Sequence, residues 1–599
     1  MAATLAHRGP DGAGSVEAGA AALGHRRLSI VDVEHGAQPM FNESGDISVI
    51  FNGEIYNAPA LIPQLAKRGH RFTTRCDTEV LVHLYEECGS EMMAQLRGMF
   101  AFALWDRRRG KGLVVRDRLG IKPLYYCALP DRLLFGSELK SLLVRPEVNR
   151  DLDPAALDAY LTLHYIPAPL TIYRNVLKLP RGHLLEIENG RVSIKEYWSI
   201  PEFEGSTSLS DDDASACLRA LLEESVEEHL MSDVPVGVFL SGGVDSSIVA
   251  ALAARKSATQ LRTFCVRFGE REFDEGNHAA LVARHLGTCH EETLVRPDAA
   301  AILPDLVRHY DEPFGDPSAV PTYYVSQAGA SRMKVCLSGD GGDELFGGYN
   351  RYSRSLSMAR YDRVPHALRR LPAAVANQVL GEHVRGHGFL SRLAAGPAER
   401  YQRLFDGFDR DSRRELLAPE WASAVAEDGG FFAPLLGDGR GRRDLLSRLQ
   451  MADLATYLPE CILTKVDRVS MAHSLEVRVP LLDHRLVEFA ATLPPAMKVR
   501  EGRRKWILKQ ATADLLPAEI LERPKRGFTL PIRDWFRGEL GHHARHVLLG
   551  ERSRQRGLLQ VGAVERLLDL HGRGQRDFSA RIWSLLFLEH WCRAALDQP

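Results

Sequence analysis

The sequence predicts an α+β domain rich in antiparallel sheet, followed by an α/β domain with a parallel sheet and a helical C-terminal part. Residues 1–198 carry short alternating apolar runs separated by turns, which is the spacing of half-buried strands. Beyond residue 213, continuous apolar runs alternate with helical patterns, and this order is typical of a parallel sheet covered by helices. Residues 199–213 are rich in Gly, Ser and Asp and indicate a linker between the domains.

The composition is that of an ordinary soluble protein. Of 599 residues, 45% are hydrophobic and 26% are charged, and 76 basic side chains balance 78 acidic ones. This balance argues against a nucleic-acid binder that depends on bulk charge. Nine cysteines without a C-x-x-C pair favour a reduced, cytoplasmic protein. Because no apolar run approaches the ~20 residues needed to cross a bilayer, we expect no membrane partner.

The strands of the N-terminal domain are predicted from alternation of apolar and polar residues. "DTEVLVHLYEECG" has apolar residues at helical spacing instead, and "FAFALW" predicts a core strand. The alternating runs are "ISVIFNGEIYN", "GLVVRDRLGIKPLYYC", "RLLFGSELK" and "HLLEIENGRVSIKEYW".

The second domain follows a strand–helix order. "ASACLRALLEESVEEHLMS" predicts a helix, and Asp211 to Asp213 before it fit a helix N-terminus better than a metal cluster. "VPVGVFL" predicts a strand buried on both faces. The helix "SSIVAALAARK", the strand "LRTFCVRF", the helix "GNHAALVARHLG" and the strand in "KVCLSGDGGDE" follow in turn. From about residue 351 the pattern is mostly helical.

A glycine-rich loop, "FLSGGVDSS", ends the first buried strand and opens a helix. Gly242 and Gly243 permit a turn that directs several N–H groups at one anion, and the Ser241 and Ser246 hydroxyls add donors. Asp245 would repel a phosphate unless a divalent cation bridged the two. The Walker pattern is absent, so the sequence predicts a phosphate loop of another type.

A second acidic loop supports this prediction. "CLSGDGGDELFGGY" follows a short apolar strand and places Asp340, Asp343 and Glu344 among glycines. Loops at the C-terminal ends of parallel strands meet in one crevice, so Asp245 and Asp343 are expected to hold Mg²⁺ between them. Lys525, in "ERPKRGF", is a candidate to stabilise charge on a transferred phosphate.

These motifs together carry a family resemblance. "SGGVDSS" resembles the pyrophosphate loop of the adenine nucleotide alpha hydrolases, and the N-terminal motifs resemble a class II glutamine amidotransferase domain. With "LTKVDRVSMAHSLEVRVPLLDHRLVEFA", the chain resembles the B-type glutamine-hydrolysing asparagine synthetases nearly end to end. The resemblance implies an Ntn-type sandwich, truncated at its start, for residues 1–198. It implies an adenine nucleotide alpha hydrolase-like ATP pyrophosphatase domain for residues 214–599. The N-terminal motifs are "HRGPDG", "GHRRLSIVD", "FNGEIYN", "RCDTEVL", "LRGMFAFALWD", "RDRLGIKPLYY" and "FGSELKSLL".

For the second domain, the resemblance implies that ATP and Mg²⁺ activate aspartate as β-aspartyl-AMP, which ammonia converts to asparagine. Asp340 and Lys525 would be catalytic, with Asp340 where many relatives carry Glu. Asp245 and Asp343 would bind the metal. The implied ATP-binding residues are Leu240, Ser241, Gly242, Gly243, Asp245, Ser246, Val266, Ser338 and Gly339.

For the first domain, the resemblance implies a glutamine pocket. Arg27 would bind the carboxylate and Asp77 the ammonium of glutamine. Asn52 and Gly53 would form the oxyanion hole of the tetrahedral intermediate. Glu54, with Arg8, would order the pocket. Ammonia would then pass between the domains through a channel.

The family's nucleophile is a cysteine directly after the initiator methionine, with its own α-amine as base. Here residue 2 is Ala2, and neither Cys76 nor Cys88 has a free α-amine. The sequence as written is therefore expected to lack normal glutaminase activity and, if Met1 is the true start, to use ammonia. We favour Met1 as an internal methionine, because "MAATLAHRGPDG" resembles the end of a helix that precedes this motif in relatives.

Two other readings remain open. The Asp-Gly-Gly-Asp loop recurs in synthetase-like enzymes that amidate a sugar, peptide or antibiotic precursor, so the acceptor is open. A truncated, inactive partner subunit is the third reading, against which the intact Asp245, Asp343 and Lys525 argue. The partners expected are small molecules, with a homodimer left open. The histidines of "HHARH", His542, His543 and His546, fit a polar helix face rather than a metal site.

Overall fold

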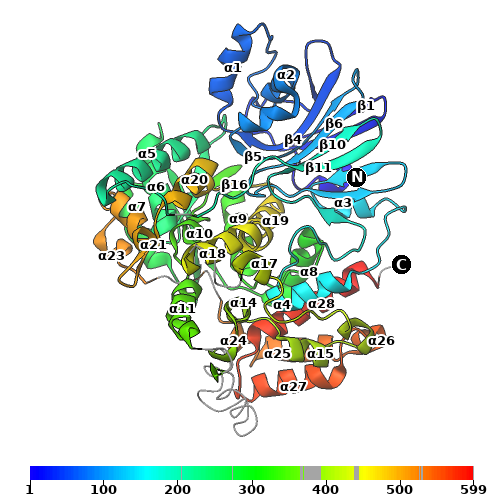
Figure 1. Cartoon of the computed structure of the whole chain (residues 1–599), viewed down its shortest axis with the longest axis vertical. Helices are drawn as coiled ribbons and strands as arrows, with labels where there is room; N and C mark the ends of the chain where they lie inside the picture. The colour runs from blue at the N-terminus through cyan, green and yellow to red at the C-terminus, as the bar shows by residue number, and fades with distance from the viewer. Residues whose placement is uncertain are drawn as a thin grey trace.

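Figure 1 shows the N-terminal domain at one end of the molecule, the parallel sheet with its helices in the middle, and the C-terminal helices at the opposite end. This computed structural model describes residues 1–203, 205–270, 272, 274–364, 368–369, 393–437, 444–524, 527 and 530–597.

The N-terminal domain is built on a six-stranded antiparallel sheet with the order β11–β10–β6–β5–β4–β3. Its central strand β5 contains the predicted core run, and its side chains alternate between two hydrophobic clusters. Phe100 and Phe102 pack on one face, whereas Ala103 and Trp105 pack on the other. The strands are β3 (Met40–Phe41), β4 (Ile47–Ile55), β5 (Gly98–Asp106), β6 (Lys111–Arg116), β10 (His183–Glu188) and β11 (Arg191–Glu196).

The N-terminal domain has four layers, one of which is this large sheet. Helices α1 (Ala58–Lys67) and α2 (Glu79–Cys88) cover one face of the large sheet. The other face packs on a β1–β2 hairpin and on the sheet β8–β7–β9, where Tyr126 points inward and Tyr125 points toward α3 and α4. This α–β–β–α order confirms the Ntn-type sandwich. The remaining elements are β1 (Gly12–Ala18), β2 (Ala21–Arg27), β7 (Tyr125–Ala128), β8 (Leu133–Gly136), β9 (Leu177–Lys178), α3 (Leu139–Leu143) and α4 (Pro154–Leu163).

The second domain contains a five-stranded sheet in which all neighbours are parallel, in the order β14–β13–β12–β15–β16. Chain order runs outward from β12 in both directions, so the crossovers leave a crevice between the ends of β12 and β15. The strands are β12 (Val236–Phe239), β13 (Arg262–Phe268), β14 (Cys289–Val295), β15 (Val335–Leu337) and β16 (Glu476–Arg478).

Helices cover both faces of this sheet, as the strand–helix pattern predicts. Helices α5 (Asp211–His229), α6 (Val244–Lys256) and α7 (Gly276–Leu286) pack on one face. Helices α9 (Ala319–Ala330) and α19 (Thr464–Met471) pack against each other on the opposite face. The acidic start of α5 is a helix N-terminus, since the Ser210 side chain accepts a hydrogen bond from the Asp213 amide.

Helices make up most of the described chain after β15. Of the helices in the described residues, none is both long and apolar enough to cross a membrane. A π-helical stretch, Asp453–Leu463, leads into α19. Helix α8 (Ala299–Tyr310) precedes β15. The helices after β15 include α10 (Gly342–Phe346), α11 (Asn350–Ala359), α14 (Pro397–Gln402), α15 (Arg410–Leu416), α16 (Pro419–Ala422), α17 (Ala433–Leu436), α18 (Leu445–Ala452), α20 (His484–Thr492), α21 (Pro495–Lys498), α22 (Trp506–Ala511), α23 (Ala518–Leu521), α24 (Ile532–Trp535), α25 (Glu539–Leu548), α26 (Glu551–Arg556), α27 (Val561–Gly572) and α28 (Ser579–Ala595).

Buried ion pairs join the two domains. Arg8 donates to both carboxylate oxygens of Asp467, at 2.7 and 3.0 Å, and to Glu138 at 3.0 Å. Arg478, on β16, contacts Glu54 of the N-terminal domain at 2.9 Å. Burial alone would raise the pKa of Glu138, but the surrounding cations lower it well below its usual value. Further pairs across the boundary are Arg468–Glu138, Arg116–Glu460, Lys178–Glu460 and Lys178–Glu312.

Replacement of Arg478 tests this network. Arg478→Met leaves the carboxylates of Glu54 and Glu476 buried without their shared cation, and removing one partner of a buried pair costs about 3–5 kcal/mol. We expect the midpoint of thermal unfolding, measured by calorimetry, to fall by several degrees. Lys111→Met, which breaks an exposed pair with Glu188, is the control and should leave the midpoint unchanged. Equal midpoints for the two variants would contradict a stabilising role of the network.

Candidate functional site

The loop after β12 is folded by its own serines. The Ser241 amide donates to the Ser246 hydroxyl at 3.3 Å, and the Gly243 amide donates to the Ser241 hydroxyl at 3.3 Å. Gly243 is the N-cap of α6, so the loop leads directly into the positive end of the helix dipole. Gly242 has φ +68°, and a Cβ there would lie 2.5 Å from His278. Glycine is therefore required for this turn.

The loop after β15 lies against this first loop. Its glycines permit the approach, since a Cβ on Gly339 would lie 2.5 Å from the Ser246 amide nitrogen. A Cβ on Gly342 would similarly lie 2.6 Å from an oxygen of Asp245. Ser338 donates to the carboxylate of Asp340 at 2.7 Å, which orients that side chain at the mouth of the loop. The parallel sheet thus brings the two predicted loops together at its crevice.

Lys505 joins the two predicted metal-binding carboxylates. Its Nζ lies 2.5 Å from Asp245 Oδ2 and 2.5 Å from Asp343 Oδ1. Lys505 follows the short hairpin of β17 (Val499–Arg500) and β18 (Arg503–Arg504), and its φ of +56° is unusual for a residue with a side chain. Sequence reasoning missed it because only the tertiary fold places it near loops more than 150 residues earlier.

A cavity of about 420 Å³ opens where these loops meet. It is also lined by Lys465 and Glu344, to which the sequence analysis assigns no role. Burial and the charge of Asp343 raise the pKa of Glu344 to about 7. Gly242 does not line the cavity, and Lys525 lies outside the described residues. The predicted residues that line it are Leu240, Ser241, Gly243, Asp245, Ser246, Val266, Ser338, Gly339, Asp340 and Asp343.

Lys465, at the start of α19, contacts Asp316 at 3.0 Å and Ser318 at 2.7 Å. Burial alone would lower the pKa of this ammonium. Its acidic neighbours, Asp316 above all and also Asp340, raise that pKa above its ordinary value. Lys465 therefore remains a cation beside the cavity. The quoted "LTKVDR" motif contains this lysine, so the sequence did carry a signal for it.

A second cavity, of about 240 Å³, lies in the N-terminal domain. The five predicted glutamine-binding residues all line it, together with Arg8 and Met1 at the start of the chain. Across the domain boundary, Arg8 contacts Asp467 and Glu54 contacts Arg478. The five are Arg27, Asn52, Gly53, Glu54 and Asp77.

Asn52 and Gly53 lie on β4 and line this cavity. Gly53 has φ +145°, and a Cβ there would lie 1.9 Å from the Met99 carbonyl oxygen. Within the described residues, the buried Asn52 amide nitrogen has no hydrogen-bond partner. It is therefore a donor available to a ligand in the cavity.

Arg27 and Asp77 each have a protein partner on the cavity wall. The Arg27 guanidinium donates to the backbone carbonyls of residues 31–33 at 2.7–3.0 Å. The Asp77 carboxylate accepts from the Ile55 amide at 2.7 Å. Burial raises the pKa of Asp77, although this hydrogen bond opposes the shift.

Helix α19 and strand β16 connect the two cavities. Lys465 and Val466 line the larger one, whereas Met471 and Glu476 line the smaller one. One short segment of chain, residues 465–476, therefore contributes to the lining of both cavities.

Comparisons with known proteins decide the family. The asparagine synthase family matches residues 217–593, and the glutamine amidotransferase domain matches residues 1–198. The chain belongs to the asparagine synthase family. It is a carbon–nitrogen ligase with a glutamine amidotransferase domain, which agrees with the resemblance in the sequence.

Curated relatives cover nearly the whole chain. The glutamine-hydrolysing asparagine synthetase 1 of Bacillus subtilis is 35% identical over 98% of this chain and 92% of its own length. A putative glutamine-hydrolysing asparagine synthetase of Mycobacterium tuberculosis is 38% identical over 98% of this chain and 92% of its own length. Amidase chyE of Penicillium rubens is 28% identical over 94% of this chain and 89% of its own length.

Gly339→Ala tests the contact between the two loops of this asparagine synthase family member. The added methyl group cannot fit at 2.5 Å from the Ser246 nitrogen, so the loops must separate. We expect ATP binding, measured by calorimetry, to weaken at least about tenfold, since a lost contact of 1.4 kcal/mol already has this effect. Gly572→Ala, with open space around it, is the control and should bind ATP normally. Normal binding by Gly339→Ala would show that the loops do not form the ATP site.

Proposed function

We propose that this family member makes L-asparagine from L-aspartate, ATP and either glutamine or ammonia, with AMP and diphosphate as the other products. The activated intermediate is β-aspartyl-AMP. One observation carries the proposal: the loops after β12 and β15 meet at one cavity, where Lys505 lies between the carboxylates of Asp245 and Asp343. Acidic and basic groups so arranged suit a polyphosphate and its counter-ion.

The phosphate end of ATP is assigned to the loop before α6. Backbone N–H groups at a helix N-terminus attract anions, and the hydroxyls of Ser241 and Ser246 add donors. Gly242 contributes the turn rather than a contact with the ligand. Leu240 and Val266, whose side chains are buried, would flank the nucleoside, and Ser338 with Gly339 would contact the nucleotide.

Mg²⁺ fits the residues present. Asp245 and Asp343 supply the hard carboxylate oxygens that this ion prefers, and a cationic Nζ already lies between them. The crowding around Gly342 and Gly348, where a Cβ would collide with these carboxylates, shows that the cradle is closely built. The bound ion would reduce the negative charge of the polyphosphate. Lys505 would then contact phosphate oxygens from the same side.

Asp340 and two lysines are assigned to the reacting end. Asp340, oriented by Ser338, would support formation of the intermediate and the attack of nitrogen. Lys465 would remain cationic beside it and offset the charge of the substrate carboxylate. Lys525 keeps its proposed role in stabilising charge on the transferred phosphate.

The smaller cavity is assigned to glutamine. The Asn52 amide and the Gly53 N–H would stabilise the oxyanion, and Asp77 would pair with the ammonium group. To bind the glutamine carboxylate, Arg27 would give up its hydrogen bonds to backbone carbonyls. The carboxylate would replace them with stronger, charge-assisted hydrogen bonds. Ammonia would pass to the ATP cavity along α19 and β16.

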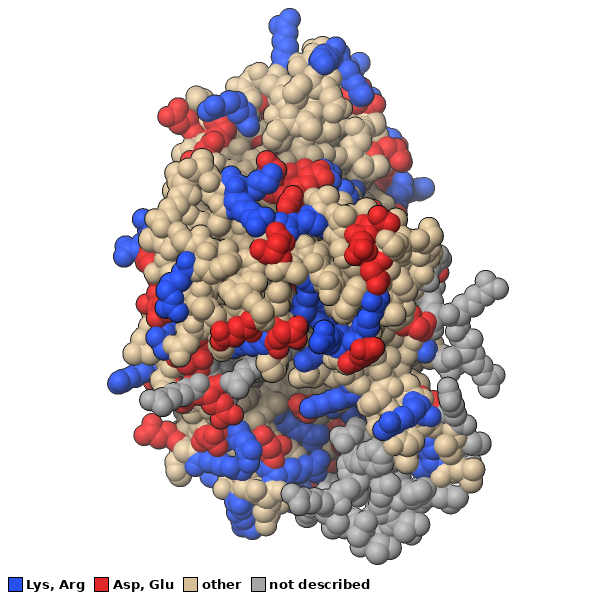
Figure 2. Space-filling view, turned by 90° about the vertical axis from the view of Figure 1, so that its left-hand side faces the viewer, with Lys and Arg blue, Asp and Glu red and all other residues tan. Residues whose placement is uncertain are grey.

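The remaining parts of the proposal are a cytoplasmic protein that acts on small molecules, without nucleic acid or membrane partners, and with a homodimer left open. On the face in Figure 2, basic and acidic side chains are interspersed over the described surface. This mixture, with a net charge of −2, does not favour a polyanion.

Asparagine formation is tested with the purified full-length chain. The protein is mixed with ATP, Mg²⁺ and aspartate, with either ammonium or glutamine, and pyrophosphate and asparagine are measured. We expect both products with ammonium, and the glutamine arm reports the amidotransferase domain separately. Pyrophosphate formed with another carboxylate, but not with aspartate, would support a different acceptor. No pyrophosphate with any carboxylate would indicate an inactive partner subunit.

A matched pair of variants tests the metal-binding carboxylate. Asp245→Asn removes one of the two charges at the cavity, and we expect pyrophosphate formation to slow by at least about 100-fold. Asp212→Asn, on the exposed start of α5, is the control and should keep wild-type activity. Full activity of Asp245→Asn would overturn the assigned ATP and metal site.

A further inference from the structure

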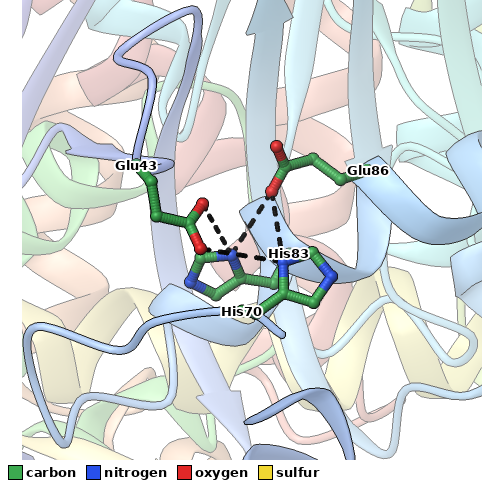
Figure 3. Close-up of side chains that lie close together, drawn as sticks. All are labelled: Glu43, His70, His83 and Glu86. Carbon is green, nitrogen blue, oxygen red and sulfur yellow. Dashed lines mark hydrogen bonds and ion pairs between the residues drawn. The ribbon is translucent and has the colours of Figure 1, made fainter. Parts of the chain in front are cut away.

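We propose that Glu43, His70, His83 and Glu86 form a tetrahedral Zn²⁺ site in the N-terminal domain. Figure 3 shows the four side chains converging on one point from three parts of the chain. Glu43 lies between β3 and β4, and His70 lies in the connection between α1 and α2. His83 and Glu86 are three residues apart on α2, so they share one face of the helix.

The distances between the candidate ligand atoms suit a shared ion. His83 Nδ1 lies 3.3 Å from Glu86 Oε2 and 3.6 Å from Glu43 Oε2. His70 Nδ1 lies 3.5 Å from Glu86 Oε2 and 3.8 Å from the other oxygen of Glu43, Oε1. All four ligand atoms lie within 4.8 Å of one another. Zinc bonds of about 2.0–2.1 Å in a tetrahedron place neighbouring ligand atoms roughly 3.3–3.4 Å apart. The three histidine–carboxylate pairs at 3.3–3.6 Å are close to this spacing.

Both histidines present Nδ1 to the centre and Nε2 to another carboxylate. His70 Nε2 contacts Glu87 at 3.0 Å, and His83 Nε2 lies 3.8 Å from Glu79. A carboxylate beside the outer nitrogen of a metal-binding histidine holds the proton there and leaves the inner nitrogen as a ligand. Both histidines therefore have the orientation of metal ligands, and the outer nitrogen of His70 also has a hydrogen-bonded carboxylate.

The carboxylates are oriented in the same way. Asn42 donates to Glu86 Oε1 at 2.7 Å, which leaves Oε2 facing the histidines. The Arg71 amide donates to Glu43 Oε1 at 2.8 Å. Glu79 is itself held by the Thr73 and Thr74 amides, each at 2.7 Å. Glu43, Glu86 and His70 thus each have an outer hydrogen bond that restricts their position.

The charge around this point favours a cation. Four carboxylates surround the two imidazoles, and among the described residues Arg68 makes an ion pair with one of them, Glu87, at 3.1 Å. Protonated histidines would also balance the charge, but both would then direct an N–H toward the same point. A single divalent cation satisfies both Nδ1 atoms and both inner carboxylate oxygens at once.

The ligand set selects zinc over magnesium. Two imidazole nitrogens and two carboxylate oxygens match the ligands that Zn²⁺ takes in tetrahedral sites, whereas Mg²⁺ prefers six oxygen ligands. Four protein ligands leave no open position, so the site is structural. The side chain of His83 is 1% exposed but that of Glu43 is 36% exposed, which gives the ion access from solvent.

A metal here would brace the connection between α1 and α2. The ion would tie His70 to α2 and to the turn at Glu43, and Asp77 lies in the same connection. The site would therefore stiffen one wall of the smaller cavity without contacting its ligand.

The test measures zinc bound to the full-length protein. Protein stripped with a chelator is equilibrated with Zn²⁺ or with Mg²⁺, freed of excess metal by gel filtration, and analysed by mass spectrometry for metal content. We expect about one Zn²⁺ per chain, no retained Mg²⁺, and a higher midpoint of thermal unfolding with zinc. Wild-type protein that retains no Zn²⁺ would overturn the proposal.

Two partly exposed ligands are changed, because the buried His83 risks the fold. We expect His70→Gln and Glu86→Gln each to weaken zinc binding at least about tenfold, as loss of even an outer partner does at other sites. Both variants should also lose the visible absorption of tetrahedral Co²⁺ bound in place of zinc. The control is His543→Gln, which breaks the 3.3 Å contact between His543 Nε2 and His590 Nε2 elsewhere in the chain. This variant should bind zinc as the wild type does. Zinc content and Co²⁺ spectra equal to wild type in His70→Gln and Glu86→Gln would overturn the proposal.

Discussion

The buried ion pairs between the two domains are the interaction on which the rest of the structure depends. Arg8 and Arg478 pair with carboxylates of the opposite domain in regions from which water is excluded. Charges in such places are costly unless each has a partner, so the pairs are satisfied only when the domains dock in one orientation. That orientation brings α19 and β16 against both cavities. The relative position of the two cavities thus depends on the ion pairs at the domain boundary.

The larger cavity depends on a different constraint, the close approach of two loops at the crevice of the parallel sheet. Gly339 and Gly342 allow the backbone after β15 to lie against Asp245 and Ser246. The same approach confines two carboxylates to one side of the cavity, where Lys505 compensates their charge. The glycines leave room for the two loops to touch, and Lys505 balances the charge of the carboxylates that this contact brings together. A larger residue in place of either glycine would disturb both the contact and the charge balance.

The local sequence predicts much of this architecture. The period-2 alternation of "FAFALW" predicts β5 and its two faces, and the apolar run before Ser241 predicts β12. The sequence also predicts loop residues such as Asp245 and Asp343, because glycine, hydroxyl and acidic residues follow a buried strand there. The ion pairs that Arg8 and Glu54 form with Asp467 and Arg478 could not be predicted, because those partners lie in the other domain.

The sequence by itself determined the two fold classes, the order of the elements and the residues of the strand-end loops, because periodicity and turn chemistry are local properties. Only the tertiary structure decided which distant side chains share a site. Lys505 reaches Asp245 across 260 residues, and His70 meets His83 through the packing of a loop on α2. Such contacts depend on how distant elements pack and how the chain turns back on itself, and no short window of sequence contains that information.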